Sequence, residues 1–205
     1  PSIVTTNLFA NYDAATGISG STFTDSSGNN RNATLFNSPT TATVNGTTVL
    51  QLSSASSQYF GNTTGYGTSL DSAFTFDVWA RNLSASTPGT LISEWSNGTF
   101  NSGWQDNQMG FNSTQINCGV YNTGYAVAKA SWTDTSWYHI VMAYNGSSLV
   151  TYVNSVAGGT TTGTKSSPGG TYLSIGKPCA DYLNGVNTYF NGYIGCLLYT
   201  SDAAD

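Results

Sequence analysis

Residues 137–154 read Trp-Tyr-His-Ile-Val-Met-Ala-Tyr-Asn-Gly-Ser-Ser-Leu-Val-Thr-Tyr-Val-Asn, and their pattern decides the fold. Apolar and polar side chains alternate over residues 138–144 and again over residues 149–154, which is the period of a strand with one buried face. Between the two runs, Asn145-Gly146 supplies the positive φ angles that a tight turn requires. The stretch therefore predicts two antiparallel strands joined as a hairpin.

The same alternation recurs in short runs bounded by Gly, Asn, Ser and Pro, whereas helical periodicity is nearly absent. The clearest run covers residues 74–80. Further strands are predicted at residues 49–52, 58–60, 91–95, 108–111, 116–121, 172–175 and 189–194. The Gly- and Thr-rich residues 158–170 are predicted to form a long loop. About a dozen strands at this spacing predict an all-β fold, a two-sheet antiparallel β-sandwich.

Length and charge narrow the class of protein. A chain of 205 residues is long enough for one large domain and short for two. Only 7% of the residues are charged, against about a quarter in average soluble domains, which favours an extracellular, cell-surface or virion protein. With five basic residues and a formal charge of -5, we expect no nucleic-acid partner. No apolar run reaches roughly 18 residues, so we expect no membrane insertion.

Four blocks of sequence carry a family resemblance. They are residues 12–14 with 25–30, residues 50–52 with 58–60, residues 74–79, and residues 137–141 with 152–154 and 190–195. In this order over residues 8–195, they resemble the laminin-G-like branch of the concanavalin A-like lectin/glucanase superfamily. The resemblance implies a jelly roll of two antiparallel sheets, with partners bound at the concave face or at edge loops. Similar openings occur in phage structural proteins.

The C-terminal residues 196–205 read Cys-Leu-Leu-Tyr-Thr-Ser-Asp-Ala-Ala-Asp and depart from the usual final strand of that family. They resemble the translation of a transposase sequencing adapter. We therefore predict a sandwich domain over residues 1–195, followed by a tail that is not native. Leu197 and Tyr199 alternate with Leu198 and Thr200, so the tail can pair as a substitute final strand.

Catalytic residues are scarce. Glycosidases of this fold use paired carboxylates, but Glu94 is the one Glu of the chain and is expected to be a surface acid on an edge strand. A pairing of Glu94 with Asp106 stays open as an alternative. His139, the one His, is expected to have a structural role with one ring nitrogen hydrogen-bonded. We therefore expect no enzyme activity and no required cofactor.

Sugar binding needs aromatic faces for stacking and amide, hydroxyl or carboxylate groups for the ring hydroxyls. The residues predicted to supply them are Trp95, Trp104, Asp106, Gln108, Tyr121, Asn122, Tyr125 and Tyr182. In contrast, Trp79, Trp132 and Trp137 are expected to fill the core or its rim. The predicted ligand site therefore lies around residues 95–125.

Two structural features stay open at this point. The resemblance implies a structural calcium, for which Asp25 is the candidate ligand, while an Asx turn capped by Asp25 is the alternative. Cys118 and Cys179 can form a disulfide in an oxidising compartment, while two buried thiols are the alternative.

The combined pattern predicts a non-catalytic, lectin-like carbohydrate-binding or adhesion module of a secreted or virion surface protein. Its partner would be a glycan or a cell-surface polysaccharide. One alternative is a structural domain of a phage or viral particle that contacts other proteins and has no sugar site. Another is a polysaccharide-active glycosidase or lyase of the same fold.

Overall fold

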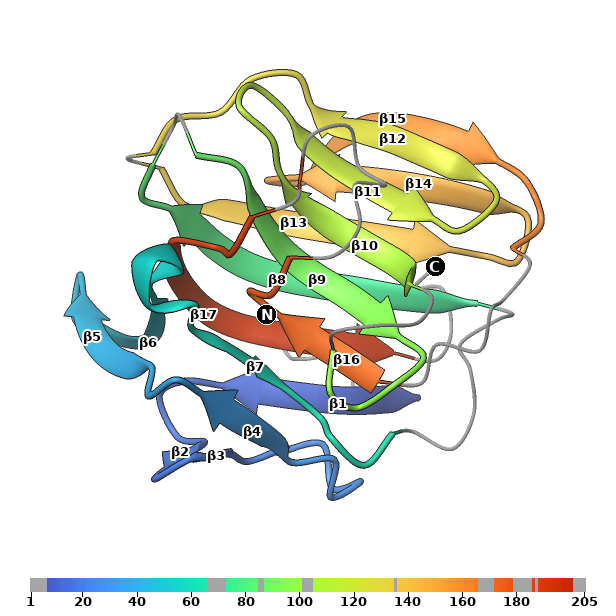
Figure 1. The fold of residues 1–205 in the computed structure, drawn as a ribbon. Helices are drawn as coiled ribbons and strands as arrows, with labels where there is room; N and C mark the ends of the chain where they lie inside the picture. The colour runs from blue at the N-terminus through green and yellow to red at the C-terminus, as the bar shows by residue number, and fades with distance from the viewer. Residues whose placement is uncertain are drawn as a thin grey trace.

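The structure is a computed structural model that describes residues 7–65, 73–84, 87–100, 105–134, 136–165, 172–178, 186 and 188–200, without the side chains of residues 105 and 106. The described strands form two antiparallel sheets that pack face to face (Figure 1). This arrangement confirms the predicted all-β sandwich of the jelly-roll type.

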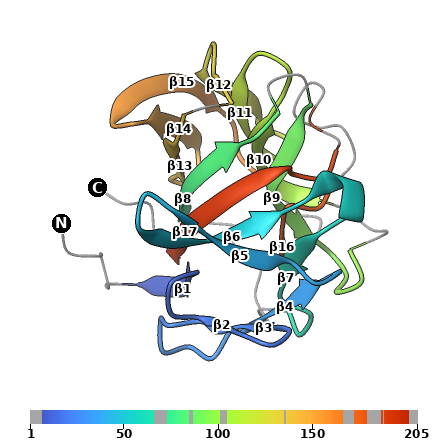
Figure 2. The ribbon, with the colours of Figure 1, turned by 90° about the vertical axis from the view of Figure 1, so that its left-hand side faces the viewer.

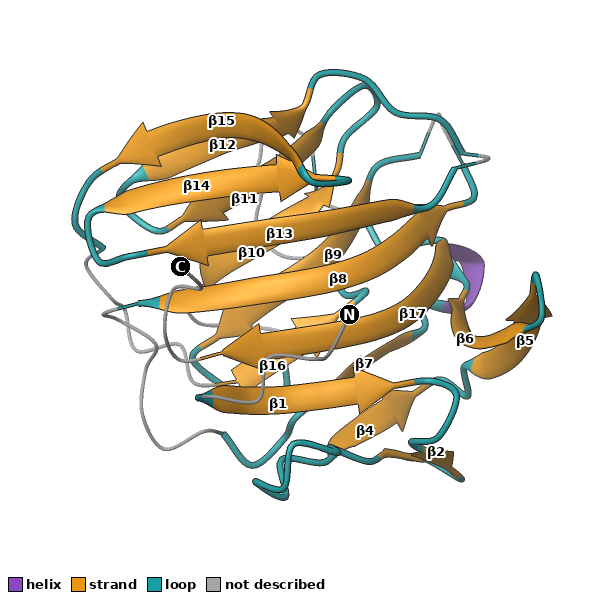
Figure 3. Ribbon diagram, turned by 180° about the vertical axis from the view of Figure 1, so that it is seen from behind, coloured by secondary structure: helices purple, strands orange, loops and turns teal. Residues whose placement is uncertain are grey.

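One sheet contains eight of the described strands and is seen face-on in Figure 3. Its order is β15-β14-β13-β8-β17-β6-β5, and β1 pairs with the C-terminal half of β17. The strands are β1 (Leu8–Asp13), β5 (Thr40–Val44), β6 (Thr47–Leu52), β8 (Phe74–Asn82), β13 (Tyr138–Tyr144), β14 (Ser148–Val153), β15 (Val156–Thr162) and β17 (Gly192–Thr200).

The other sheet contains nine described strands in the order β12-β11-β10-β9-β16-β7-β4-β3-β2. They are β2 (Ile18–Ser19), β3 (Thr22–Phe23), β4 (Ala33–Phe36), β7 (Tyr59–Gly61), β9 (Gly89–Trp95), β10 (Gln105–Phe111), β11 (Ile116–Val120), β12 (Gly124–Lys129) and β16 (Tyr172–Ile175). A short 3-10 turn, η1 (Ser54–Ser56), precedes β7.

The predicted hairpin is the pair β13 and β14. Tyr144 lies opposite Leu149, and the turn between them contains Gly146 with φ 93°. The Asn145 side-chain oxygen accepts a hydrogen bond from the Ser148 N–H at 2.8 Å, which closes the turn. The hairpin is therefore confirmed.

Alternation along β8 separates the core from the surface. Phe74, Phe76 and Val78 point between the sheets and are fully buried, while Asp77 and Trp79 point outward. Inward side chains of this kind from both sheets form one large hydrophobic cluster. The core thus depends on the period-two pattern that is readable in the sequence.

The predicted long loop over residues 158–170 is wrong in its first part, because β15 runs to Thr162. The two glycines of β15 permit a close approach to β12 of the other sheet. A Cβ atom on Gly158 would lie 2.4 Å from the Ala128 carbonyl oxygen, and one on Gly159 would lie 2.9 Å from the Val127 carbonyl oxygen. Glycine, which often indicates a loop, here lets two edge strands meet at the side of the sandwich.

The segment after Gly195 forms the second half of β17, as predicted for a substitute final strand. Leu197 and Tyr199 are fully buried, while Leu198 and Thr200 are half-buried. This half pairs with β1 on one side and with β8 on the other. Residues 201–205 lie outside the described part.

The β5–β6 hairpin extends from the edge of the eight-stranded sheet, and Figure 2 views the molecule from that side. Val44 pairs with Thr47, so Asn45 and Gly46 form a two-residue turn. Both have positive φ angles, 50° and 80°, as this tight turn requires. The hairpin becomes important below because it forms one wall of a groove.

Candidate functional site

Three of the predicted ligand residues share one face of the nine-stranded sheet, the face turned away from the core. Gln108 lies opposite Ser93 on one side and Gly119 on the other, and Gly119 lies opposite Tyr125. Trp95 is two residues beyond Ser93 on the same strand and therefore shares its face. The structure thus brings Trp95, Gln108 and Tyr125 onto a common surface, as the prediction of one site requires.

These three residues differ, however, in how deeply their side chains are buried. Trp95 is only 4% exposed, its indole N–H donates to Ser174 Oγ at 2.7 Å, and it packs beside Tyr59 and Phe100. Gln108 is fully buried. Neither side chain therefore offers a surface for stacking a sugar in this structure.

The remaining predicted ligand residues are placed in part. Tyr121 and Asn122 lie in the turn between β11 and β12, and Tyr125 is 43% exposed just after it. Trp104 and Tyr182 lie outside the described residues, and so does the Asp106 side chain.

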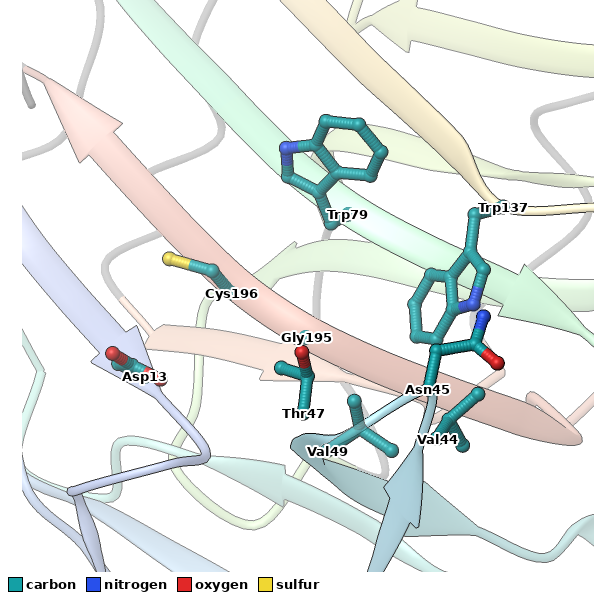
Figure 4. A pocket seen from close by; sticks show the side chains of 9 residues that line it. All are labelled: Asp13, Val44, Asn45, Thr47, Val49, Trp79, Trp137, Gly195 and Cys196. Atoms are coloured by element: carbon teal, nitrogen blue, oxygen red, sulfur yellow. The ribbon is translucent and has the colours of Figure 1, made fainter. Parts of the chain in front are cut away.

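A groove is present on the opposite side of the molecule, on the outer face of the eight-stranded sheet (Figure 4). Its cavity volume is about 340 Å³, at the lower end of the range of ligand sites. We call it the outer groove, and it is lined by Asp13, Val44, Asn45, Thr47, Val49, Trp79, Trp137, Gly195 and Cys196. These residues come from β1, the β5–β6 hairpin, β8, β17 and the segment before β13, which are distant in the sequence.

Trp79 is the most exposed large aromatic side chain of the outer groove, at 47%. Its ring stacks on the His139 imidazole with a centroid distance of 4.9 Å and an interplanar angle of 13°. His139 Nε2 in turn donates to Asp77 Oδ1 at 2.8 Å, so one ring nitrogen is hydrogen-bonded as predicted. The expectation that Trp79 fills the core or its rim is wrong, because its position in β8 turns it to the outer face.

Trp137 forms a second aromatic surface of the outer groove and stacks on Tyr193 with a centroid distance of 6.3 Å. Gly195 separates the two tryptophans. A Cβ atom on Gly195 would lie 3.6 Å from the Trp79 Cβ atom and 3.9 Å from the Trp137 ring. Gly195 is therefore the floor between the two indoles, and its missing side chain keeps that space open.

Polar groups stand around these aromatic surfaces. Figure 4 shows Asp13 at one end of the outer groove, Asn45 near Trp137 at the other end, and Thr47 facing the tryptophans from β6. Carboxylate, amide and hydroxyl groups beside accessible aromatic rings are the combination that sugar recognition uses.

Cys196 lines the outer groove and lies near two acidic side chains. Burial raises the pKa of the Cys196 thiol to about 12, and the nearby charges of Asp13 and Asp77 contribute in the same direction. Both carboxylates disfavour a further negative charge at this position. The outer groove is therefore electronegative near Asp13.

Two sequence signals could have found the outer groove. In Phe74–Asn82, Trp79 alternates in phase with the polar Asp77 and Arg81, which indicates the solvent face. Asn45-Gly46 between two Thr/Val runs is a strong signal for a hairpin. The meeting of these segments depends on the strand order, which no local pattern contains.

Trp132, another of the three tryptophans expected in the core or its rim, is where it was predicted. It is 9% exposed, packs edge-on against Phe111 and donates its indole N–H to the Asn112 carbonyl oxygen at 3.0 Å.

Glu94 is not the surface acid that was predicted. β9 is an inner strand, and Glu94 is fully buried between the sheets. Its carboxylate lies 3.8 Å from Lys165 Nζ and accepts hydrogen bonds from the Asn107 amide and, at 3.4 Å, from the Tyr199 hydroxyl. This cluster satisfies a buried charge within the core.

Asp25 organises its loop through both carboxylate oxygens. Oδ1 accepts hydrogen bonds from the N–H groups of Asn11 and Ser27, and Oδ2 accepts from the Arg31 N–H and the Ser27 hydroxyl, all within 3.0 Å. The described residues contain no group of three or more His, Cys, Asp or Glu side chains that could hold a metal ion. Asp25 therefore forms the Asx turn that was the alternative interpretation, and a calcium ion at this loop stays a prediction.

Cys118 is a free cysteine and is fully buried on β11. Its predicted disulfide partner, Cys179, lies outside the described residues. Burial raises the pKa of the Cys118 thiol far above its ordinary value.

The described fold and comparisons with known families agree on the class of protein. The chain belongs to the concanavalin A-like lectin/glucanase superfamily, because the laminin-G profile of that superfamily matches residues 55–203. No curated protein sequence matches the chain. No helix in the described part has the length and hydropathy needed to cross a membrane.

Several solved structures are similar in fold. Domain 4 of AbnA, a GH43 extracellular arabinanase from Geobacillus stearothermophilus solved with arabinotriose, has 14% identity and a TM-score of 0.66, over 97% of this chain and 94% of that one. The binding domain of botulinum neurotoxin DC, solved with SialylT, has 12% identity and a TM-score of 0.69, over 98% and 49%. Trypanosoma rangeli sialidase with sialic acid has 13% identity and a TM-score of 0.69, over 98% and 31%. Identities at this level show a shared fold.

Proposed function

We propose that the chain is a non-catalytic carbohydrate-binding module of an extracellular protein and that the outer groove binds the sugar. The observation that carries the proposal is the exposed Trp79 indole beside a groove with polar ends. An indole that is 47% exposed keeps apolar surface in contact with water, and covering that surface with a partner is favourable. The C–H face of a pyranose is a partner of suitable shape and chemistry.

The architecture supports a preformed site. Trp79 stacks on His139, its neighbour on β13, and Trp137 stacks on Tyr193. Side chains held in this way lose little conformational freedom when a ligand arrives, which favours binding. The similar structures solved with arabinotriose, SialylT and sialic acid make a sugar the first ligand class to test.

The positions of the acids support the non-catalytic part of the proposal. Hydrolysis of a glycosidic bond by this kind of enzyme needs two carboxylates about 5–10 Å apart across the bond. Asp13 is the one carboxylate among the described residues that line the outer groove. Glu94, the one Glu, is buried in contact with Lys165 and presents no surface to a substrate.

The test is a glycan array followed by titration calorimetry on the best ligand. Trp79→Ala and Trp137→Ala should each weaken binding about tenfold or more, because each removes an aromatic stacking surface. Tyr125→Ala is the matched control, since it removes a 43%-exposed aromatic side chain from the other sheet. Binding that is lost in Tyr125→Ala and retained in Trp79→Ala would assign the sugar to the nine-stranded sheet instead.

A second variant tests the groove without removing an aromatic ring. Gly195→Val fills the floor between the tryptophans, where a Cβ atom makes only ordinary contacts. We expect a native circular dichroism spectrum and no sugar binding. Turnover of any polysaccharide by the wild-type chain would contradict the non-catalytic proposal.

A further inference from the structure

The charges around the outer groove suggest which sugars it accepts. Asp13 lies at the end of β1, half-buried, where β1 pairs with β17 at Cys196. Its Oδ1 atom accepts a hydrogen bond from the Ala15 N–H at 2.9 Å. The carboxylate is therefore fixed by its own turn and lines the end of the groove beside Cys196 (Figure 4).

None of the basic residues of the described chain lines the outer groove, and contacts hold most of them elsewhere. The Arg31 guanidinium lies over the Phe9 ring at 3.4 Å, and Lys165 is buried beside Glu94. Lys177 lies over the Tyr59 ring of the other sheet at 4.9 Å. These three cations cannot neutralise an acidic ligand at Asp13.

Arg81 shares the outer face with Trp79 and therefore needs separate consideration. Its Nε–H donates to the Asp134 carbonyl oxygen at 3.1 Å, which directs the guanidinium toward that loop. Asp77, on the same face, hydrogen-bonds to His139 behind Trp79. The Asp13 end of the outer groove therefore keeps its negative charge, since no basic residue among the described ones lines it.

We propose that the outer groove selects sugars that carry a free amino group, with Asp13 as the residue that recognises the ammonium group, and that it excludes uronic and sialic acids. An ammonium group beside Asp13 would form a charge-assisted hydrogen bond. It would also approach the electron-rich face of Trp79, which attracts cations. A sugar carboxylate in the same place would meet Asp13 with no lining cation to compensate.

This inference rests on the proposed sugar-binding function of the same groove and makes a narrower claim. It also separates this chain from the similar structures solved with sialic acid or SialylT, which are acidic ligands. Shared fold alone would not predict that difference.

The experiment compares three probes with the full chain: a glucosamine oligosaccharide, its fully N-acetylated counterpart, and an oligogalacturonate of equal length. We expect the free amine to bind about tenfold more tightly than the acetylated form, and the uronate to bind most weakly. Asp13→Asn keeps the oxygen that accepts the Ala15 hydrogen bond and removes the charge. In this variant the affinities of the amine and the acetylated form should agree within about twofold.

Asp134→Asn is the matched control, because it changes the net charge equally at a carboxylate outside the groove. High salt should reduce the preference for the amine in the wild type and have little effect in Asp13→Asn. Equal affinity of the wild type for the amine and the acetylated form, or a preference unchanged in Asp13→Asn, would overturn the selectivity. Failure of every probe and every array glycan to bind would instead contradict the proposed function itself.

Discussion

Trp79 and Trp95 both lie on the outer face of their sheets, but Trp79 is exposed and Trp95 is buried. Each points from the outer face of its sheet, away from the core between the sheets. Trp79 is 47% exposed and stacks on its cross-strand neighbour His139, while Trp95 is 4% exposed and packs against Phe100 beside Tyr59. The difference shows that strand alternation sets the face from which a side chain points. Whether an aromatic ring on that face stays accessible depends on which other segments pack over it.

The glycines near the two tryptophans also differ in the space around them. Beside Trp79, Gly195 leaves space that nothing among the described residues fills. Beside Trp95, the nearby glycines are in tight contact, and a Cβ atom on Gly61 would lie 2.7 Å from the Phe100 ring. One face of the sandwich is thus an open groove, and the other contains a second, smaller hydrophobic cluster.

Trp95→Ala gives the largest expected effect. Removing this buried indole and its hydrogen bond to Ser174 should lower the free energy of unfolding by about 3–5 kcal/mol, while Trp79→Ala should lower it by less than about 1 kcal/mol. Urea denaturation followed by circular dichroism measures both. Equal losses in the two variants would show that the two regions do not differ as described.

Glu94→Gln sharpens the comparison between the buried Glu94–Lys165 ion pair and the partly exposed Asp77–His139 pair. It leaves the buried Lys165 without its charged partner and should cost about 3 kcal/mol of unfolding free energy. Asp77→Asn, in the partly exposed pair with His139, should cost less than about 1 kcal/mol. The double variant Glu94→Gln/Lys165→Met should regain part of the loss, and a double variant that loses more than Glu94→Gln would contradict the buried-pair account.

Gly158 and Gly195 differ in the space available for a side chain: an added Cβ atom would clash at Gly158 and would make only ordinary contacts at Gly195. Gly158→Ala forces a Cβ atom to within 2.4 Å of the Ala128 carbonyl oxygen and should cost about 1–3 kcal/mol by separating β15 from β12. Gly195→Ala, whose nearest contact is 3.6 Å, should change stability by less than about 0.5 kcal/mol. Thermal unfolding of the two variants side by side measures the difference. A larger loss in Gly195→Ala would mean that the groove floor is not open.

The last expected effect concerns alkaline stability and is absent at neutral pH. The buried Cys118 thiol has a raised pKa in the folded chain, while in the unfolded chain it ionises near 9.0. Its stabilising contribution is therefore complete below about pH 9 and decreases above it, by at most about 1.4 kcal/mol per pH unit. Cys118→Ala should flatten this decrease, as measured by urea denaturation at several alkaline pH values. An unchanged pH dependence would mean that other groups cause the loss.

Much of the fold is predictable from the sequence because strand signals are local. Residues 138–144 and 172–175 form strands with the predicted bounds, and Asn145-Gly146 forms the predicted turn. The exception at β15 has a local cause, since its two glycines look like a loop until β12 lies against them.

The site was less predictable. The candidate residues around Trp95 do share a face, but Trp95 and Gln108 are buried and Tyr125 is 43% exposed, while Trp79 on the other sheet is 47% exposed. The expectation for Glu94 failed for a related reason, because β9 lies inside the sheet and its side chain meets Lys165 from a distant part of the chain.

The sequence alone determined the strand class, the inward and outward face of most side chains, and the presence of a single Glu and a single His, because each depends on composition or on a period of two residues. Only the tertiary structure decided which outward aromatic ring is covered. That outcome depends on strand order, which sets Trp79, Trp137 and Gly195 beside the β5–β6 hairpin and sets Phe100 against Trp95. Such contacts join residues far apart in the chain, and they are selected by packing of the whole sandwich.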